Sequence, residues 1–329
     1  MSALAPTLQL FFTERLAKQR QASVATLHSY RRTMVLLVGF AADHSHKAPC
    51  ELDWEDLGPD TICAFLDHLE TERHNCARSR NARLAAIRSL YRFAALRHPE
   101  HAGLIAQVLA IPQKRYDKAL VCFLEPTELE ALLGACDRRR WEGRRDHALI
   151  ALGAQTGLRL SELTGLRCGD VHLGDGPHVR CVGKGRKERQ VPLTKANVAI
   201  LRVWLRERAG AAPDPAFPTR SGSRLSDDAV EARLAVHKKA AETSCPSLAG
   251  KRITPHVLRH TCAMNLLREG VDTAVIALWL GHADLRSTNA YLHADMSVKE
   301  RALARITPPS SPPGRFRPSE KLLAFLESL

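Results

Sequence analysis

The residues best suited to chemistry lie near the C-terminus, in the stretch TPHVLRHT and at Tyr291. Thr254 is a good N-cap and Pro255 suits a first turn, so the stretch predicts the start of a helix. His256 and Arg259, three residues apart, then project from that start. Because a helix start offers unpaired N–H groups and a partial positive charge, the pattern indicates a phosphate cradle, with the Tyr291 phenol as a candidate nucleophile.

The elements that must position these residues are predicted to be mostly helices. HALIALGAQ at 147–155 is apolar enough for a buried central helix, and TGLRLSEL turns through Gly157 into a new short helix. HVRCVGKGRKERQVPL, residues 178–193, alternates on either side of GKGRK and predicts a β-hairpin. Further helices are expected at about 195–209, 226–242, 255–269 and 272–280.

The first hundred residues are patterned as helices throughout, with apolar spacing of three and four at 23–41, 60–72 and 78–97. Seven arginines lie between Arg73 and Arg97, and no acidic residue separates Glu72 from Glu100. Such a run is either a solvated face or a helix lying along a phosphate backbone. The absence of compensating acids favours the phosphate backbone.

The helical pattern breaks at 98–123, where Pro99, Gly103 and Pro112 precede the basic stretch PQKRYDKAL. We interpret residues 112–120 as a basic linker between two domains. Helices resume after Leu124, and the chain ends with a Pro-rich spacer followed by the amphipathic segment KLLAFLESL.

Charge and cysteine content narrow the class of protein. The 329 residues carry a formal net charge of +13, which favours nucleic acid as an anionic partner. Residues 1–110 hold 13 basic and 11 acidic side chains, so most of the excess lies with the proposed chemistry. Nine cysteines without a CxxC pair indicate core thiols in a reducing compartment. No signal segment or membrane-spanning run is present, so a cytoplasmic protein without a membrane partner is expected.

Five motifs together resemble the tyrosine recombinases, the phage-integrase family, and most closely its Xer-like and mobile-element members. They are GLRLSEL, VGKGRKERQVPL, HVLRH, LGH and Tyr291, in that order, and the resemblance covers roughly residues 10–300. It implies a mainly α fold with a small β-sheet (α+β), in which a SAM-like core-binding domain and a catalytic domain form a C-shaped clamp. The implied parts are a DNA-binding domain at 1–111, the linker at 112–120, a catalytic domain at 121–305, and the spacer and C-terminal segment at 306–329.

The resemblance also implies a role for each site residue. Tyr291 is the nucleophile, and Arg159 and Arg259 bind the non-bridging oxygens, where planar guanidiniums suit the developing charge. Lys184 protonates the leaving 5′ oxygen, with Lys187 as the competing candidate. The remaining assignments are pocket positions for His256 and His282, and supporting positions for Glu162 and His260.

The expected DNA contacts are basic residues of the N-terminal helices, the linker and the hairpin: Arg80, Arg83, Arg88, Arg92, Lys114, Arg115, Arg186 and Lys187. No metal or other cofactor is expected, because cationic side chains take the place of a metal in this chemistry.

The resulting hypothesis is a site-specific recombinase that cleaves and rejoins DNA through a 3′-phosphotyrosine intermediate, in integration, excision or resolution. Its expected partners are double-stranded DNA with inverted half-sites and copies of itself, as a dimer on the site and a tetramer at synapsis, alone or beside a sister recombinase. It would be nucleoid-associated in use. The alternatives are a type IB topoisomerase and a catalytically silent DNA-binding protein.

KLLAFLESL is expected to dock on a neighbouring protomer, with folding back onto its own domain as the alternative.

Overall fold

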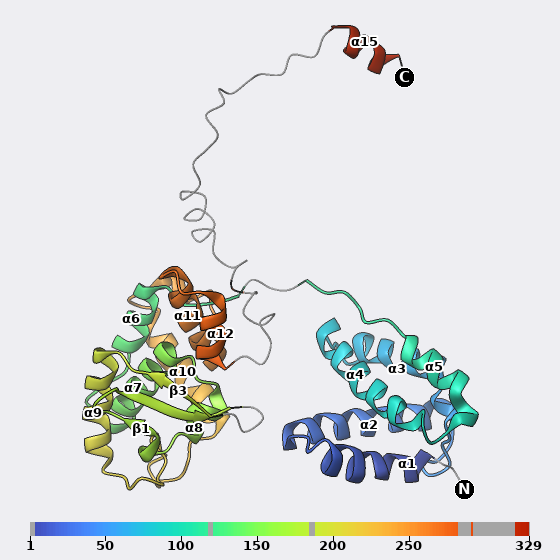
Figure 1. Cartoon of the computed structure of the whole chain (residues 1–329), viewed down its shortest axis with the longest axis horizontal. Coiled ribbons are helices and arrows are strands. Elements are labelled where there is room, and N and C mark those ends of the chain that lie inside the picture. Colours follow the sequence, from blue (N-terminus) through green and yellow to red (C-terminus); the bar gives the residue numbers. More distant parts are fainter. Residues whose placement is uncertain (1–3, 118–120, 184–187, 282–290, 292–319, 329) are drawn as a thin grey trace. The chain divides into compact units, whose positions relative to one another are not determined.

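The computed structural model describes residues 4–117, 121–183, 188–281, 291 and 320–328, and the chain divides into two compact units, Met1–Lys118 and Ala119–Leu329. Figure 1 shows the helices and strands of both units. As the sequence predicts, the described residues are mainly helical, with one small sheet. No helix in these ranges is both long enough and apolar enough to cross a bilayer.

Within residues 4–117, the described part of the first unit, all the regular elements are helices. They are α1 (Leu4–Leu10), which continues into the π-helical segment η1 (Phe11–Gln19), α2 (Val24–Ser45), α3 (Pro59–Thr71), α4 (Ala77–Ala94) and α5 (Ala102–Ala110), joined by the short 3-10 turns η2 (Glu55–Leu57) and η3 (Pro99–His101). Their apolar faces meet around Trp54, Phe65 and Tyr91, all at most 1% exposed. The expected break of the helical pattern at 98–123 is wrong in its first part, because η3 and α5 occupy residues 99–110.

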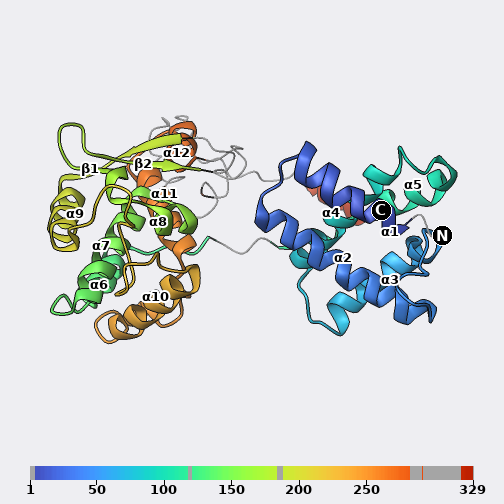
Figure 2. The same cartoon turned by 90° about the horizontal axis from the view of Figure 1, so that it is seen from below.

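The second unit is mainly helical and carries one antiparallel three-stranded sheet, in the order β1-β2-β3 (Figure 2). Its elements are α6 (Pro126–Gly134), α7 (Trp141–Thr156), α8 (Leu160–Gly165), η4 (Cys168–Asp170), β1 (Val171–His172), β2 (His178–Val182), β3 (Glu188–Pro192), α9 (Lys195–Arg208), α10 (Asp227–Ala241), η5 (Pro246–Leu248), α11 (Pro255–Arg268) and α12 (Thr273–Leu280). A further helix, α15 (Glu320–Glu327), lies near the C-terminus.

The predicted hairpin is confirmed as β2 and β3, which pair antiparallel with Val179 opposite Val191 and Cys181 opposite Arg189. Its alternation follows the period of two: Val179, Cys181 and Val191 face the core, and the residues between them face outward. The two-residue strand β1, which the sequence did not reveal, adds the third strand at the edge of β2.

Helix α7 forms the centre of the second unit, as its apolar composition predicts. Residues 148–154 are buried on every side of the helix, and α9 and α11 pack against it. Gly157 ends α7 in the left-handed region at φ +63°, with its N–H bonded to the carbonyl of Gly153. The chain therefore turns sharply at this point, which brings Arg159 and α8 to the end of the central helix.

Candidate active site

Helix α11 begins as the sequence predicts, and its first turns carry three of the expected site residues. The Thr254 hydroxyl accepts the backbone N–H of Val257 at 3.4 Å, and Pro255 occupies the first turn. His256 is exposed at this start, whereas Arg259 is only 4% exposed and His260 is half-buried. The same helix end thus presents an imidazole to solvent and holds a guanidinium inside.

The guanidinium of Arg259 is fixed by two backbone carbonyls from other segments. Its Nη1 donates to the carbonyl of Gly157 at 2.6 Å, and its Nη2 donates to that of Leu280 at 2.8 Å. Burial, and then the charge of Arg159, lower the pKa of Arg259 to about 10, so it remains protonated at neutral pH. Because a guanidinium has five N–H donors, two such contacts set its plane and leave donors for an oxyanion.

Glu162 links Arg159 to a second arginine. Its carboxylate, 7% exposed, accepts the backbone N–H of Arg159 at 2.8 Å and the Nη1 of the same residue at 3.0 Å. Arg189 of β3 donates both Nη atoms to this carboxylate, at 2.9 and 2.7 Å. Burial acts to raise the pKa of Glu162, but the hydrogen bonds from Arg189 and from the Arg159 backbone outweigh it, so the pKa is lowered. The ionised carboxylate is therefore a fixed anchor for both guanidiniums.

The end of α12 gathers these arginines in one place. Three successive carbonyls there each accept a guanidinium: Trp279 from Arg189 at 3.2 Å, Leu280 from Arg259 at 2.8 Å and Gly281 from Arg159 at 2.7 Å. Carbonyls at a helix C-terminus lack helical partners and carry partial negative charge, which suits cations. Gly281 closes the helix at φ +65°, and a Cβ at this position would lie 2.9 Å from Nη1 of Arg189.

Tyr291 lies inside the second unit, against α11 and α12. Its side chain is 3% exposed and packs with Cys262, Met264 and Ile276. The phenol oxygen lies 3.0 Å from Nδ1 of His260, and the two rings meet edge to face. Burial raises the pKa of the Tyr291 phenol, although the charge of nearby Arg259 acts against it. The structure thus brings the expected nucleophile to the helix that carries Arg259.

Four of the expected site residues lie outside the ranges that the structure describes: Lys184, Arg186, Lys187 and His282. Arg189 was missed by the sequence analysis, although a signal existed: it is two residues before the inward-facing Val191 on a strand, so its side chain shares that face.

The arginines of α4 differ in how far their side chains are exposed to solvent. Arg80 is 6% exposed and its Nε lies 3.4 Å from the Glu70 carboxylate, so its side chain is largely enclosed within the first unit, and its predicted contact with DNA stays a prediction. Arg83 donates to the hydroxyl of Thr33 at 2.9 Å, and Arg88 to the carbonyl of Ile111, and both are half-buried. Arg92 is exposed.

The expected linker residues Lys114 and Arg115 are exposed, but Lys114 also makes hydrogen bonds to the helices of the first unit. Its Nζ contacts Glu70 at 2.5 Å, and its backbone exchanges hydrogen bonds with the side chain of Asn81 at 2.8 and 3.1 Å. This part of the stretch is therefore anchored to α4.

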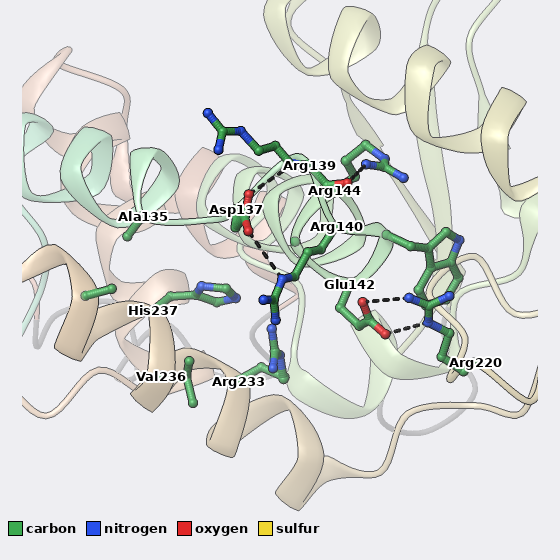
Figure 3. Close-up of a pocket in the computed structure, with 13 residues that line it drawn as sticks. Ala135, Asp137, Arg139, Arg140, Glu142, Arg144, Arg220, Arg233, Val236 and His237 are labelled. Atoms are coloured by element: carbon green, nitrogen blue, oxygen red, sulfur yellow. Dashed lines mark hydrogen bonds and ion pairs between the residues drawn. The ribbon is translucent and has the colours of Figure 1, made fainter.

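A separate pocket of about 920 Å³ lies at the opposite end of α7, between the start of that helix and α10 (Figure 3). Its basic side chains are largely matched by carboxylates: Arg220 pairs with Glu142, and Arg233 and His237 reach the buried Asp146 at 2.6 and 2.8 Å. The sixteen residues of α7, about 24 Å of helix, separate it from the arginine cluster. The described ranges contain no group of three or more His, Cys, Asp or Glu side chains able to hold a metal ion.

Comparison with protein families gives two matches along the chain. Residues 11–98 match the N-terminal SAM-like domain of phage integrases, and residues 122–297 match the phage integrase family itself. A protein of Sinorhizobium fredii named "Putative integrase/recombinase y4rC" is 50% identical over 328 residues, covering 100% of this chain and 99% of the relative. The tyrosine recombinase XerC of Xanthomonas campestris is 32% identical over 296 residues, covering 86% and 83%.

Solved structures have the same fold at lower identity. XerH site-specific recombinase, crystallised on its palindromic difH substrate after cleavage, has a TM-score of 0.69 at 22% identity, covering 91% of this chain and 84% of XerH. A lambda integrase tetramer bound to a Holliday junction has a TM-score of 0.64 at 17% identity, covering 88% and 76%.

Proposed function

The chain belongs to the phage integrase family, and we propose that it is a site-specific DNA recombinase that acts through a transient bond between Tyr291 and a DNA phosphate. The observation that carries this proposal is the contact of the Tyr291 phenol with His260 of α11, the residue after the buried Arg259, while Arg259 and Arg159 both bind carbonyls at the end of α12. A buried nucleophile beside fixed guanidiniums is suited to attack on a phosphodiester.

In the proposed reaction, the Tyr291 oxygen attacks phosphorus and the 5′ oxygen leaves, which yields a 3′-phosphotyrosine and a free 5′-hydroxyl. Negative charge builds on the non-bridging oxygens, where we assign Arg159, Arg259 and the exposed His256 as donors. Because the carbonyls of α12 and the Glu162 carboxylate already hold the guanidiniums, little reorganisation is needed at the moment of attack. We assign the proton for the 5′ oxygen to Lys184, with Lys187 as the competing donor, and a further phosphate contact to His282.

The reverse reaction explains why the intermediate is covalent. The phosphotyrosine keeps the free energy of the broken phosphodiester, so a 5′-hydroxyl from another strand attacks it and expels the phenol. No step needs ATP. We therefore assign strand exchange, rather than hydrolysis, as the outcome.

We further propose that residues 1–111 bind DNA, that 112–120 form the basic linker, that 121–305 carry out catalysis, and that 306–329 form a spacer and a docking segment. The named structures of XerH on difH and of a lambda integrase tetramer on a junction support DNA as the partner and a tetramer as the assembly. For the phosphate contacts of the first unit and linker we retain Arg83, Arg88, Arg92, Lys114 and Arg115, and for the hairpin Arg186 and Lys187. The protein would act at the nucleoid, alone or with a sister recombinase.

The proposal is tested with nicked duplexes that tile both flanks of the gene, in which cleavage releases a short strand and traps the covalent complex. The protein is incubated with each duplex in the presence of EDTA and without ATP, and adducts are resolved under denaturing conditions. We expect an adduct on at least one duplex with the wild type and with Tyr116→Phe, whose tyrosine is 47% exposed, and none with Tyr291→Phe. An adduct that persists in Tyr291→Phe, or tight binding of a duplex without any adduct, would refute the proposal.

A further inference from the structure

His260 of α11 contacts the proposed nucleophile. Its Nδ1 lies 3.0 Å from the Tyr291 oxygen, the atom that would attack phosphorus. Tyr291 is buried and His260 is half-buried, and their rings meet at 64° with centroids 5.5 Å apart. A hydrogen bond to the reacting atom is the geometry required of a group that receives its proton.

The surroundings of His260 keep its ring able to accept. Burial, and then the charges on His256 and Arg259, lower the pKa of His260 to about 4, so the imidazole is neutral at pH 7. In the tautomer with its proton on Nε2, Nδ1 accepts the phenolic O–H of Tyr291.

We propose that His260 is the general base of the cleavage step, a role that rests on the function proposed above. As the Tyr291 oxygen forms its bond to phosphorus, the phenolic O–H bond breaks and the proton moves to Nδ1 of His260. The P–O5′ bond breaks in the same displacement, and the 5′ oxygen receives a separate proton from the general acid. On rejoining, His260 returns its proton to the departing phenol, so protons and charges balance over the cycle.

The neighbouring groups are less suited to this role. Arg259 is a cation whose Nη atoms donate to carbonyls, and Glu162 is engaged by Arg159 and Arg189. His256 lies on the same helix with its ring 6.2 Å from that of His260, and it is exposed.

The arrival of DNA supplies the driving force that the resting site lacks. A scissile phosphate beside His256 and Arg259 adds negative charge to the cluster, which favours the protonated form of His260. At the same time, the phenol becomes more acidic as its oxygen bonds to phosphorus. A base that is weak without DNA therefore becomes adequate only when the substrate is in place.

The contact itself is tested without DNA. The full chain is labelled with 3-fluorotyrosine, and the Tyr291 resonance is assigned by its absence in Tyr291→Phe. We expect His260→Phe to shift this ¹⁹F resonance and to leave those of the other three tyrosines in place. An unmoved Tyr291 resonance would show that the contact does not exist in solution, and would overturn the proposal.

The chemical role is tested with the nicked duplex that gives the most adduct with the wild type. His260→Asn keeps an acceptor atom at the position of Nδ1 but cannot hold the proton, whereas His260→Phe removes both properties. Since general base catalysis contributes about 10²–10⁴-fold, we expect both variants to form adduct at least about 100-fold more slowly. If His260→Asn forms adduct at a rate close to that of the wild type, His260 only positions the nucleophile. If His260→Phe forms adduct faster than the wild type, the contact restrains the nucleophile. Either result overturns the proposal.

A duplex with sulfur in place of the bridging 5′ oxygen separates the two proton transfers, because a thiolate leaves without protonation. We expect this duplex to restore adduct formation in Lys184→Ala but not in the His260 variants. Recovery in His260→Phe would place His260 on the leaving-group side, which contradicts the proposal. If the wild type forms no adduct on any duplex, the proposed function itself fails, and this outcome is distinct from a defect confined to His260.

Discussion

Replacing Gly157 with alanine tests how the turn after α7 builds the arginine cluster. Gly157 has φ +63°, and a Cβ at this position would lie 2.5 Å from Cδ2 of Leu280 and 3.2 Å from Cβ and Sγ of Cys262. The left-handed conformation costs an alanine about 1–2 kcal/mol, and crowding in a packed interior costs about 1–3 kcal/mol more. We therefore expect Gly157→Ala to lower the free energy of unfolding of the second unit by about 2–5 kcal/mol.

Gly176 provides a matched control. It has the same φ of +63°, but a Cβ added there meets no heavy atom within 4 Å. Gly176→Ala carries the backbone cost alone, so we expect a loss of about 1–2 kcal/mol. Comparing the two variants isolates the crowding against α11 and α12 from the backbone conformation.

The assay is denaturant unfolding of the full chain followed by tryptophan fluorescence. Three of the four tryptophans, Trp141, Trp204 and Trp279, lie in the unit that contains Gly157. Since the Gly157 carbonyl also accepts Arg259 at 2.6 Å, Gly157→Ala should slow adduct formation in addition to losing stability. Equal losses of stability in both variants would refute the crowding argument.

The ion pairs of Arg189, Glu162 and Arg80 can each be tested by substitution. Arg189→Met should destabilise the second unit by about 3 kcal/mol, at the low end for a broken buried pair because Glu162 keeps its other arginine; an unchanged thermal midpoint would contradict this. Folding lowers the pKa of Glu162, so the stabilisation from its ionised carboxylate is complete above the ordinary pKa of 4.5 and is lost as the pH falls from there through the lowered pKa. Glu162→Gln should therefore lose less stability than the wild type on the acid side of a pH series. An acid limb as steep as that of the wild type would argue against this prediction. Arg80→Gln should lower the stability of the first unit, because Arg80 is buried beside Glu70. The exposed Arg92 serves as the comparison: Arg92→Gln should leave stability unchanged and reduce the slope of log affinity for DNA against log salt by about 1. Reversed effects in the two variants would refute a structural role for Arg80.

Much of the fold follows from local patterns that act over a few residues. The cap and proline at the start of α11 and the alternation of the hairpin predict those elements directly. Helix α5 was missed because Pro99 and Gly103 were interpreted as breakers, whereas proline in a first turn and glycine near a helix start cost little. A two-residue strand such as β1 carries no pattern long enough to detect.

The side-chain partners were less predictable, because they depend on contacts between distant segments. Arg80 lies four residues before Leu84 and on the same apolar stripe as Ile87, so its spacing favours the interior of the unit. The sequence analysis treated it only as one member of a run of basic residues and overlooked this spacing. That Arg189 binds Glu162, or that the end of α12 receives three guanidiniums, required the packing of β3, α8 and α12. The contact between His260 and Tyr291 spans 31 residues and is likewise a product of tertiary structure.

The most direct test of the central claim is to map the covalent bond. The trapped complex is digested with protease and nuclease, and mass spectrometry locates the peptide that carries the residual nucleotide, while polynucleotide kinase probes the released strand. We expect the nucleotide on Tyr291, linked through a 3′-phosphate, and a released strand that the kinase labels without prior phosphatase treatment. A nucleotide on any other residue, or a released strand that bears a 5′-phosphate, would contradict it.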